Sequence, residues 1–325
     1  MSVYRHALAA VCISAALFAS PLLRADAHGE EPESADATIP EPLYFASEGS
    51  TRVGGRTIDY NVVAATMEMK DQEGEVIAHF GYTAYTRKGG DRSTRPILFA
   101  YNGGPGSASM WLHMGILGPQ RADVDDVSIN TLGPFKRVNN EFSVLDRADL
   151  VMIDPVGTGF SRPVGDAKGE DFWGVDNDIE SVSNFIARYI SDNGRWASPK
   201  YLLGESYGGI RSGGVAYELL SAHSIALNGV ILVSPYMDFV GGNNGAVNDL
   251  ADVNYLSTFA ATAWYHSAID DRPDSLTEFL AEADAFAYGE YASVLLKGAR
   301  ATAEERASVL AGLERFTGIS ADYWD

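Results

Sequence analysis

The sequence YLLGESYGG at positions 201–209 is the clearest indication of the fold of this chain. Residues 204–208 fit the pattern G-x-S-x-G, in which a serine sits in a sharp, strained turn between a strand and a helix. The flanking sequence agrees, because residues 201–203 are typical of a short strand and residues 210–222 have the spacing of an amphipathic helix. Ser206 is therefore the candidate nucleophile, with an ordinary glycine-rich turn as the alternative.

Short apolar runs alternate with longer helical segments on both sides of this turn. The predicted strands are residues 96–101, 150–154, 201–203 and 229–233, and the clearest helical spacing runs from 175 to 190. Strands separated by helices form a parallel sheet that is covered on both faces. Two earlier stretches, 57–69 and 75–86, predict an antiparallel hairpin. The predicted fold class is α/β, with a mixed, mostly parallel sheet that an antiparallel hairpin precedes.

The N-terminal residues have the pattern of a secretory signal. Arg5 and His6 precede an apolar run over residues 7–17, which is too short to span a membrane comfortably. Ala25 and Ala27 are small residues at the two positions that a signal peptidase recognises. We expect residues 1–27 to be a cleaved signal peptide, with an N-terminal membrane anchor as the alternative. The protein is then exported, to the periplasm or beyond the cell.

Three further segments follow the signal. Residues 28–42 are rich in Glu, Pro and Asp and predict a flexible leader, and residues 43–243 hold the α/β core. Residues 244–325 predict a helical lid or insertion. Its expected helices are 247–266, 276–295 and 303–316, two of which begin with capping-box patterns, Ser275 with Glu278 and Thr302 with Glu305.

Composition excludes several classes of function. The net charge of −20 disfavours binding to nucleic acid and to anionic membranes. The only cysteine, Cys12, lies in the predicted signal, so neither a disulfide nor a thiol nucleophile is expected in the mature chain. No metal-ligand spacing and no phosphate-binding loop is found, and we expect neither a metal nor a cofactor.

A second glycine-rich segment, NGGPG at 102–106, directly follows the predicted strand 96–101. In a fold with the G-x-S-x-G turn, a loop at this place donates one backbone N–H of the oxyanion hole, and the residue after the nucleophile donates the other. That residue is Tyr207. Consecutive glycines let the backbone N–H groups point inward without interference from side chains. Taken alone, the loop would be a turn like many others.

Three motifs in this order resemble the serine carboxypeptidase family, whose members have the α/β-hydrolase fold. They are YNGGPGS at 101–107, DPVGTGFS at 154–161 and GESYGG at 204–209. The resemblance covers about residue 57 to the end of the chain. It implies release of C-terminal residues from peptides through an acyl-enzyme at Ser206.

The resemblance also implies roles for five residues around Ser206. Gly104 and Tyr207 would donate to the oxyanion, and Asn102, Gly103 and Glu205 would bind the terminal carboxylate of the peptide. Two carboxylates in contact cannot both ionise cheaply, so one of them shares its proton with the other. We therefore predict activity that favours acidic pH.

The chain departs from the family pattern in three ways. Ser107 stands where the family often has a cysteine, and Ile116-Leu117 stand where an acidic residue commonly precedes a Gly-Pro pair. Above all, the catalytic Asp and His of the family lie far downstream, and no matching segment occurs before Asp325. The C-terminal strands of the fold are likewise expected to be missing.

None of the histidines is a strong candidate for the base. His223 lies seventeen residues after Ser206 across a helix, about 25 Å away at a rise of about 1.5 Å per residue. His79 and His113 are expected to be structural, and His266 to lie on a helix surface. The triad Asp and His are therefore not identified, and the chain is expected to be either truncated or degenerate.

Three functions remain open at this point. The first is an exported serine-type carboxypeptidase that acts on peptides with a free C-terminus. The second is an acyltransferase or esterase that uses the same nucleophile. The third is a non-catalytic protein that retains the carboxylate pocket and binds peptides without cleaving them.

Overall fold

The computed structural model describes residues 39–124, 136–239, 241, 248–270 and 272–324. The predicted signal peptide and most of the predicted leader lie outside these ranges. Residues 39–43 precede the first strand and belong to no regular element. No helix in the described ranges is long and apolar enough to cross a membrane.

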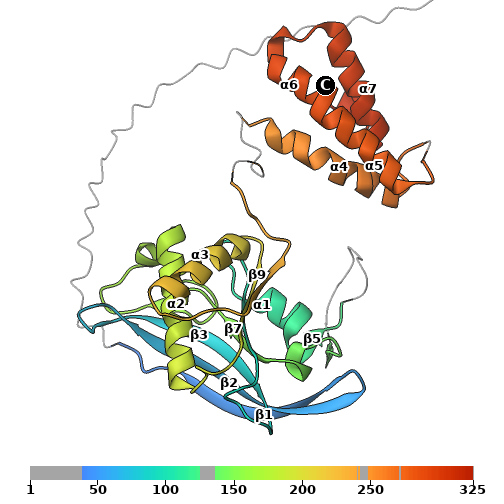
Figure 1. The fold of residues 1–325 in the computed structure, drawn as a ribbon. Helices are drawn as coiled ribbons and strands as arrows, with labels where there is room; N and C mark the ends of the chain where they lie inside the picture. Colours follow the sequence, from blue (N-terminus) through green and yellow to red (C-terminus); the bar gives the residue numbers. More distant parts are fainter. Residues whose placement is uncertain (1–38, 125–135, 240, 242–247, 271, 325) are drawn as a thin grey trace, which may run out of the picture. The chain divides into compact units, whose positions relative to one another are not determined.

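A mixed sheet organises the core (Figure 1). Its strands pair in the order β1-β2-β3-β7-β4-β9-β10, and the short strand β8 pairs with β3. Their bounds are β1 Tyr44–Val53, β2 Arg56–Lys70, β3 Val76–Arg87, β4 Ile97–Tyr101, β7 Asp149–Ile153, β8 Arg162–Pro163, β9 Lys200–Glu205 and β10 Gly229–Val233. The first strands and the β3–β7 pair are antiparallel, whereas β7, β4, β9 and β10 run parallel. The predicted fold class is confirmed, including the hairpin of β2 and β3.

The sequence prediction was incomplete at one margin of this sheet. It missed β1, which pairs with β2 along its whole length, and the separate two-stranded sheet of β5 (Gln120–Ala122) and β6 (Arg137–Asn139). At the other margin, β10 pairs with β9 and with no other described strand. Val230, Ile231 and Leu232 of β10 are 42–46% exposed, although they are all apolar.

Helices cover the two faces of the sheet. On one face, α2 (Val175–Asp192) and α3 (Gly208–Ser221) pack on a cluster that contains Phe80 and Phe99. On the other face, the short helix α1 (Met110–Leu112) and the π turn at His113–Leu117 pack on a cluster that contains Leu98 and Leu150. All five residues of β4, and likewise of β7, are buried, as expected for central parallel strands.

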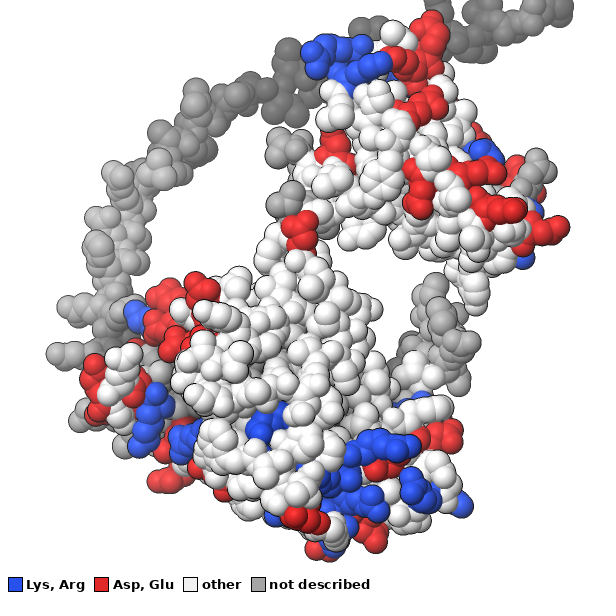
Figure 2. Space-filling view, in the orientation of Figure 1, with Lys and Arg blue, Asp and Glu red and all other residues white. Residues whose placement is uncertain are grey.

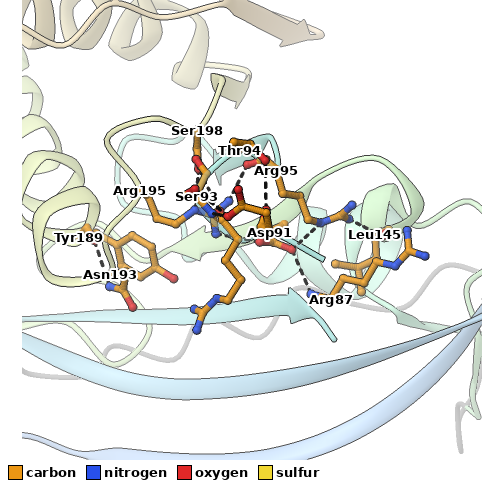
Figure 3. Close-up of polar contacts among 12 residues, drawn as sticks. Arg87, Asp91, Ser93, Thr94, Arg95, Leu145, Tyr189, Asn193, Arg195 and Ser198 are labelled. Carbon is orange, nitrogen blue, oxygen red and sulfur yellow. Dashed lines mark hydrogen bonds and ion pairs between the residues drawn. The ribbon is translucent and has the colours of Figure 1, made fainter. Parts of the chain in front are cut away.

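A buried ion network fixes the amino ends of the parallel strands. The Asp149 carboxylate at the start of β7 accepts hydrogen bonds from Arg95 Nε at 2.8 Å and from Arg195 Nη1 at 2.7 Å. Arg195 also donates to Ser198 Oγ and to the carbonyl of Arg95 (Figure 3). These contacts satisfy the buried charges. The network therefore stabilises the amino ends of the parallel strands, opposite to the carboxyl ends.

Residues 250–324 form helices with their own apolar clusters. Their bounds are α4 Leu250–Tyr265, α5 Leu276–Phe286, α6 Ala292–Lys297, α7 Ala303–Thr317 and α8 Ala321–Trp324. The predicted helix 276–295 is interrupted by a π turn at Ala287–Tyr291. Thr302 and Glu305 form the predicted capping box, whereas only the Ser275 half of the other pattern forms. Acidic side chains lie on this segment and on the core, in keeping with the net charge (Figure 2).

Candidate active site

Ser206 occupies the turn between β9 and α3. Its backbone φ is +57°, a value that is uncommon for a residue other than glycine and typical of a strained turn at a functional site. The serine N–H donates to Val233 O at 3.0 Å, and the serine carbonyl accepts from Tyr236 N at 2.8 Å. A Cβ at Gly204 would lie 2.1 Å from the carbonyl oxygen of Gly208, so only glycine fits there. The local conformation is the one that the G-x-S-x-G pattern predicted.

The 102–106 loop lies directly against this turn. A Cβ on Gly103 would lie 2.5 Å from the backbone nitrogen of Tyr207 and 2.6 Å from the carbonyl oxygen of Glu205. Gly104 has a φ of +107°, which favours glycine. Within the described ranges, neither Gly104 N–H nor Tyr207 N–H has a hydrogen-bond acceptor. Two backbone donors thus remain available in the loop and in the turn.

Three residues that the sequence grouped together also meet in space. Asn102 Nδ2 donates to Glu205 Oε2 at 3.1 Å, and Gly103 N–H donates to the same oxygen at 3.3 Å. The other end of the Asn102 amide is fixed, because its Oδ1 accepts from Leu112 N at 3.1 Å. Asn102 is buried and Glu205 is partly exposed. Two N–H donors thus converge on one oxygen of the Glu205 carboxyl group, in the residue directly before Ser206.

Comparison with protein families identifies the family of the chain. The family model described as serine carboxypeptidase matches residues 69–307, well over half of the chain. The chain belongs to the serine carboxypeptidase family. The resemblance of the three motifs is thereby confirmed at the level of the family.

Individual family members match over shorter stretches. Serine carboxypeptidase-like 36 of Arabidopsis thaliana is 28% identical over 153 residues, which are 45% of this chain and 29% of that protein. The pheromone-processing carboxypeptidase KEX1 of Saccharomyces cerevisiae is 30% identical over 146 residues, which are 43% of this chain and 19% of that protein. The matched stretches therefore cover less than a third of the length of each of these relatives.

A solved structure is also similar. The crystal structure of KEX1(delta)p, a prohormone-processing carboxypeptidase from Saccharomyces cerevisiae, aligns with a TM-score of 0.44 and 20% identity. The alignment covers 79% of this chain and 53% of that one.

The second motif of this serine carboxypeptidase-family chain, residues 154–161, stabilises the segment that follows the glycine-rich loop. Asp154 Oδ1 accepts from Ser109 N at 2.9 Å, just beyond the glycine-rich loop. Burial raises the pKa of Asp154, while the N–H groups of Ser109 and Phe160 act in the opposite direction. Ser161 Oγ, the last residue of the motif, donates to the carbonyl of Asp154 and accepts from Gly81 N. The motif thus ties the end of β7 to the segment that follows the loop.

The sequence analysis missed Arg211, which lies five residues after Ser206. Its guanidinium is fully buried between the loop, the turn and α2, and it pairs with Asp178 at 2.7 Å. A cavity of about 290 Å³ beside the loop is lined in part by Arg211, Pro105 and Trp173. Arginine is rarely buried unless it is paired, so an arginine in the first turns of a helix expected to pack on the sheet could have indicated a special role.

No histidine is hydrogen-bonded to Ser206 Oγ in the part of the chain that the structure describes. His113 Nε2 lies 2.6 Å from the Tyr85 hydroxyl, and burial lowers the pKa of His113. His79 is buried in β3, and His223 follows the end of α3. His266 ends α4, in the helical segment. The described residues supply a nucleophile and donors, and the base of a triad is not identified among them.

Proposed function

We propose that this chain carries the nucleophile, oxyanion and carboxylate-binding parts of a serine-type carboxypeptidase. The observation that carries the proposal is the convergence of Asn102 Nδ2 and Gly103 N–H on the Glu205 carboxyl group, one residue before Ser206. A substrate carboxylate that takes over these donors would hold the last peptide bond of a peptide beside the serine hydroxyl. Family membership supports this assignment of the substrate class.

In the proposed reaction, Ser206 Oγ attacks the carbonyl carbon of the last peptide bond. The negative charge that develops on the carbonyl oxygen is stabilised by the N–H groups of Gly104 and Tyr207, which have no other acceptor among the described residues. The C–N bond then breaks, the C-terminal amino acid leaves with a proton on its amine, and water hydrolyses the serine ester. The group that accepts and returns the proton is not among the residues identified here, so activity of these 325 residues alone is not part of the proposal.

Glu205 gives the proposed site its dependence on pH. A substrate carboxylate beside Glu205 would leave two negative charges in contact unless one proton is shared between them. We expect a peptide with a free C-terminus to bind better at about pH 5 than at about pH 8. Glutamine at position 205 would supply an N–H donor at every pH and should remove this dependence.

The site is tested with one peptide in two forms, one with a free C-terminus and one amidated. We expect the free form to bind at least about tenfold more tightly, because charge-assisted hydrogen bonds to a carboxylate contribute about 1.5–3 kcal/mol. Calorimetry of the wild type, of Glu205→Gln and of the matched control Glu180→Gln, an exposed acid on α2, measures the preference. Equal affinity for the two peptides would refute the carboxylate site.

Binding without cleavage by the same carboxylate-binding residues is the alternative to this function. Mass spectrometry of the peptide after incubation distinguishes the two. Release of the last residue by the wild type but not by Ser206→Ala indicates an enzyme, whereas tight binding with intact peptide indicates a binding protein.

We also propose that the protein is exported and cut after Ala27. Expression in a bacterial host followed by N-terminal sequencing of the exported fraction tests this. A first residue at His28 is expected, and an uncleaved protein in the membrane fraction would contradict the proposal.

A further inference from the structure

Arg211 connects the three elements that form the candidate site. Its Nη1 donates to the backbone carbonyl of Asn102 at 2.7 Å, and its Nε and Nη2 form a two-point contact with the Asp178 carboxylate at 2.7 and 3.0 Å. The guanidinium carbon lies 5.2 Å from the ring centres of both Tyr101 and Tyr207. The side chain therefore contacts the glycine-rich loop, the residue after the nucleophile, and α2.

The contact with Asn102 has a consequence for its neighbour Gly103. The carbonyl of Asn102 and the N–H of Gly103 belong to one peptide unit, which is planar, and in the trans form the two groups point in opposite directions. The carbonyl points at Arg211 and the N–H points at Glu205 Oε2. Whatever fixes the direction of the carbonyl therefore also fixes the direction of the N–H.

We propose that Arg211 is a positioning residue that holds the Asn102–Gly103 peptide unit with its N–H directed at the carboxylate-binding position. The proposal rests on the proposed function of Asn102, Gly103 and Glu205. Gly103 makes such a restraint useful, because a glycine beside a peptide unit opposes its rotation less than another residue does. Without the guanidinium, the carbonyl of Asn102 loses its buried partner, and rotation of the peptide unit is opposed only by the weaker contact of Gly103 N–H with Glu205 Oε2 at 3.3 Å and by the packing of the loop.

The surroundings of Arg211 explain why arginine suits this position. A planar guanidinium reaches a carboxylate with one edge and a carbonyl with another, whereas the single ammonium group of lysine is a point charge. Asp178 neutralises the buried cation, and the two tyrosine rings cover it. Burial, and after it the nearby Asp178 carboxylate, raises the pKa of Tyr207 to about 12, so this ring stays uncharged.

Two variants separate positioning from stability. Arg211→Lys retains a cation for Asp178 but cannot hold both partners in the same geometry. Asp178→Asn removes the ion pair and leaves the contact of Arg211 with the Asn102 carbonyl in place. If Arg211 positions the loop, Arg211→Lys reduces the preference for the free over the amidated peptide by about tenfold or more. Asp178→Asn then lowers the melting temperature while the preference stays within about threefold of the wild type.

The measurements are peptide affinities, melting temperatures and the amide resonance of Gly103 in nitrogen-15 NMR spectra of the full chain. The inference is overturned if Arg211→Lys keeps the wild-type preference and Gly103 resonance. It is also overturned if the preference falls in both variants in proportion to the melting temperature, because the role is then only structural. Should Arg211→Lys fail to fold, Arg211→Gln, whose side-chain NH2 group can still donate, replaces it under the same criteria. Should Asp178→Asn fail to fold, the preference and the Gly103 resonance of the Arg211 variant decide alone.

Failure of the proposed function gives a different result. If the wild type does not distinguish free from amidated peptide, the carboxylate site is refuted. The positioning role is then judged by NMR alone. A Gly103 resonance that moves in Arg211→Lys but not in Asp178→Asn supports it, and one that moves in neither refutes it.

Discussion

Substitution of Gly103 by alanine tests how closely the glycine-rich loop contacts the nucleophile turn. The added Cβ would lie 2.5 Å from Tyr207 N and 2.6 Å from Glu205 O, both of them backbone atoms of a turn that also bonds to β10. Ordinary contacts of a Cβ begin near 3.4 Å, so the loop and the turn have to separate by close to 1 Å. Overpacking of this kind costs about 1–3 kcal/mol of stability.

The larger effect is expected on function, because a displacement of about 1 Å at a reacting site can reduce a rate about a hundredfold. We expect Gly103→Ala to lose its preference for a peptide with a free C-terminus, and calorimetry with the free and amidated peptides measures this loss. Gly115→Ala is the matched control, because a Cβ at Gly115 meets no atom within 4 Å. If Gly103→Ala bound the free peptide as the wild type does, the contact between loop and turn would not determine recognition, and the reasoning would be wrong.

Three further predictions concern stability. Two neighbouring glycines of α3 should respond in opposite directions in chemical denaturation: Gly213→Ala, whose Cβ has open space, gains about 0.5–1 kcal/mol, whereas Gly214→Ala, whose Cβ would lie 2.1 Å from Ile179 Cδ1, loses about 1–3 kcal/mol. Arg195→Met should cost about 3–5 kcal/mol, because Asp149 loses one of its two buried guanidinium partners, and a loss below about 1 kcal/mol would contradict this account. Burial lowers the pKa of His113, so the unfolded chain takes up a proton there more readily than the folded chain does. The free energy of unfolding therefore has its full contribution from His113 above about pH 6.5 and loses it as the pH falls. The free energy of unfolding of His113→Gln, measured between about pH 7 and 5, should depend less on pH than that of the wild type.

The central part of the fold was predictable because its signals are local. The turn at Ser206 needs glycine at defined positions, and the buried strands β4 and β7 are continuous apolar runs. The strand β1 was not predicted, because most of its residues are exposed, the apolar Tyr44 and Phe45 among them, and its pairing with β2 gives no local pattern. Alternation of buried residues is weak in such an edge strand.

The candidate site was predictable only in part, for a similar reason. The grouping of Asn102, Gly103 and Glu205 followed from motifs, and the structure brings these residues together. Arg211 carries no motif of its own. Its importance depends on a carbonyl 109 positions earlier in the chain and on Asp178, 33 positions earlier. Contacts over such separations arise from the packing of α2 and α3 on the sheet, which periodicity does not specify.

The contacts that position the carboxylate-binding donors are independent of the base that the chemical step requires. The donors at Asn102 and Gly103 are held by Leu112, Arg211 and Glu205, and the turn at Ser206 is held by backbone bonds to β10 and the segment after it. None of these contacts involves the base that a serine nucleophile requires. The proposed recognition of a terminal carboxylate therefore does not require a histidine at Ser206. Binding of a free C-terminus is therefore the more direct test of the site, and peptide release tests a further requirement, the presence of a base.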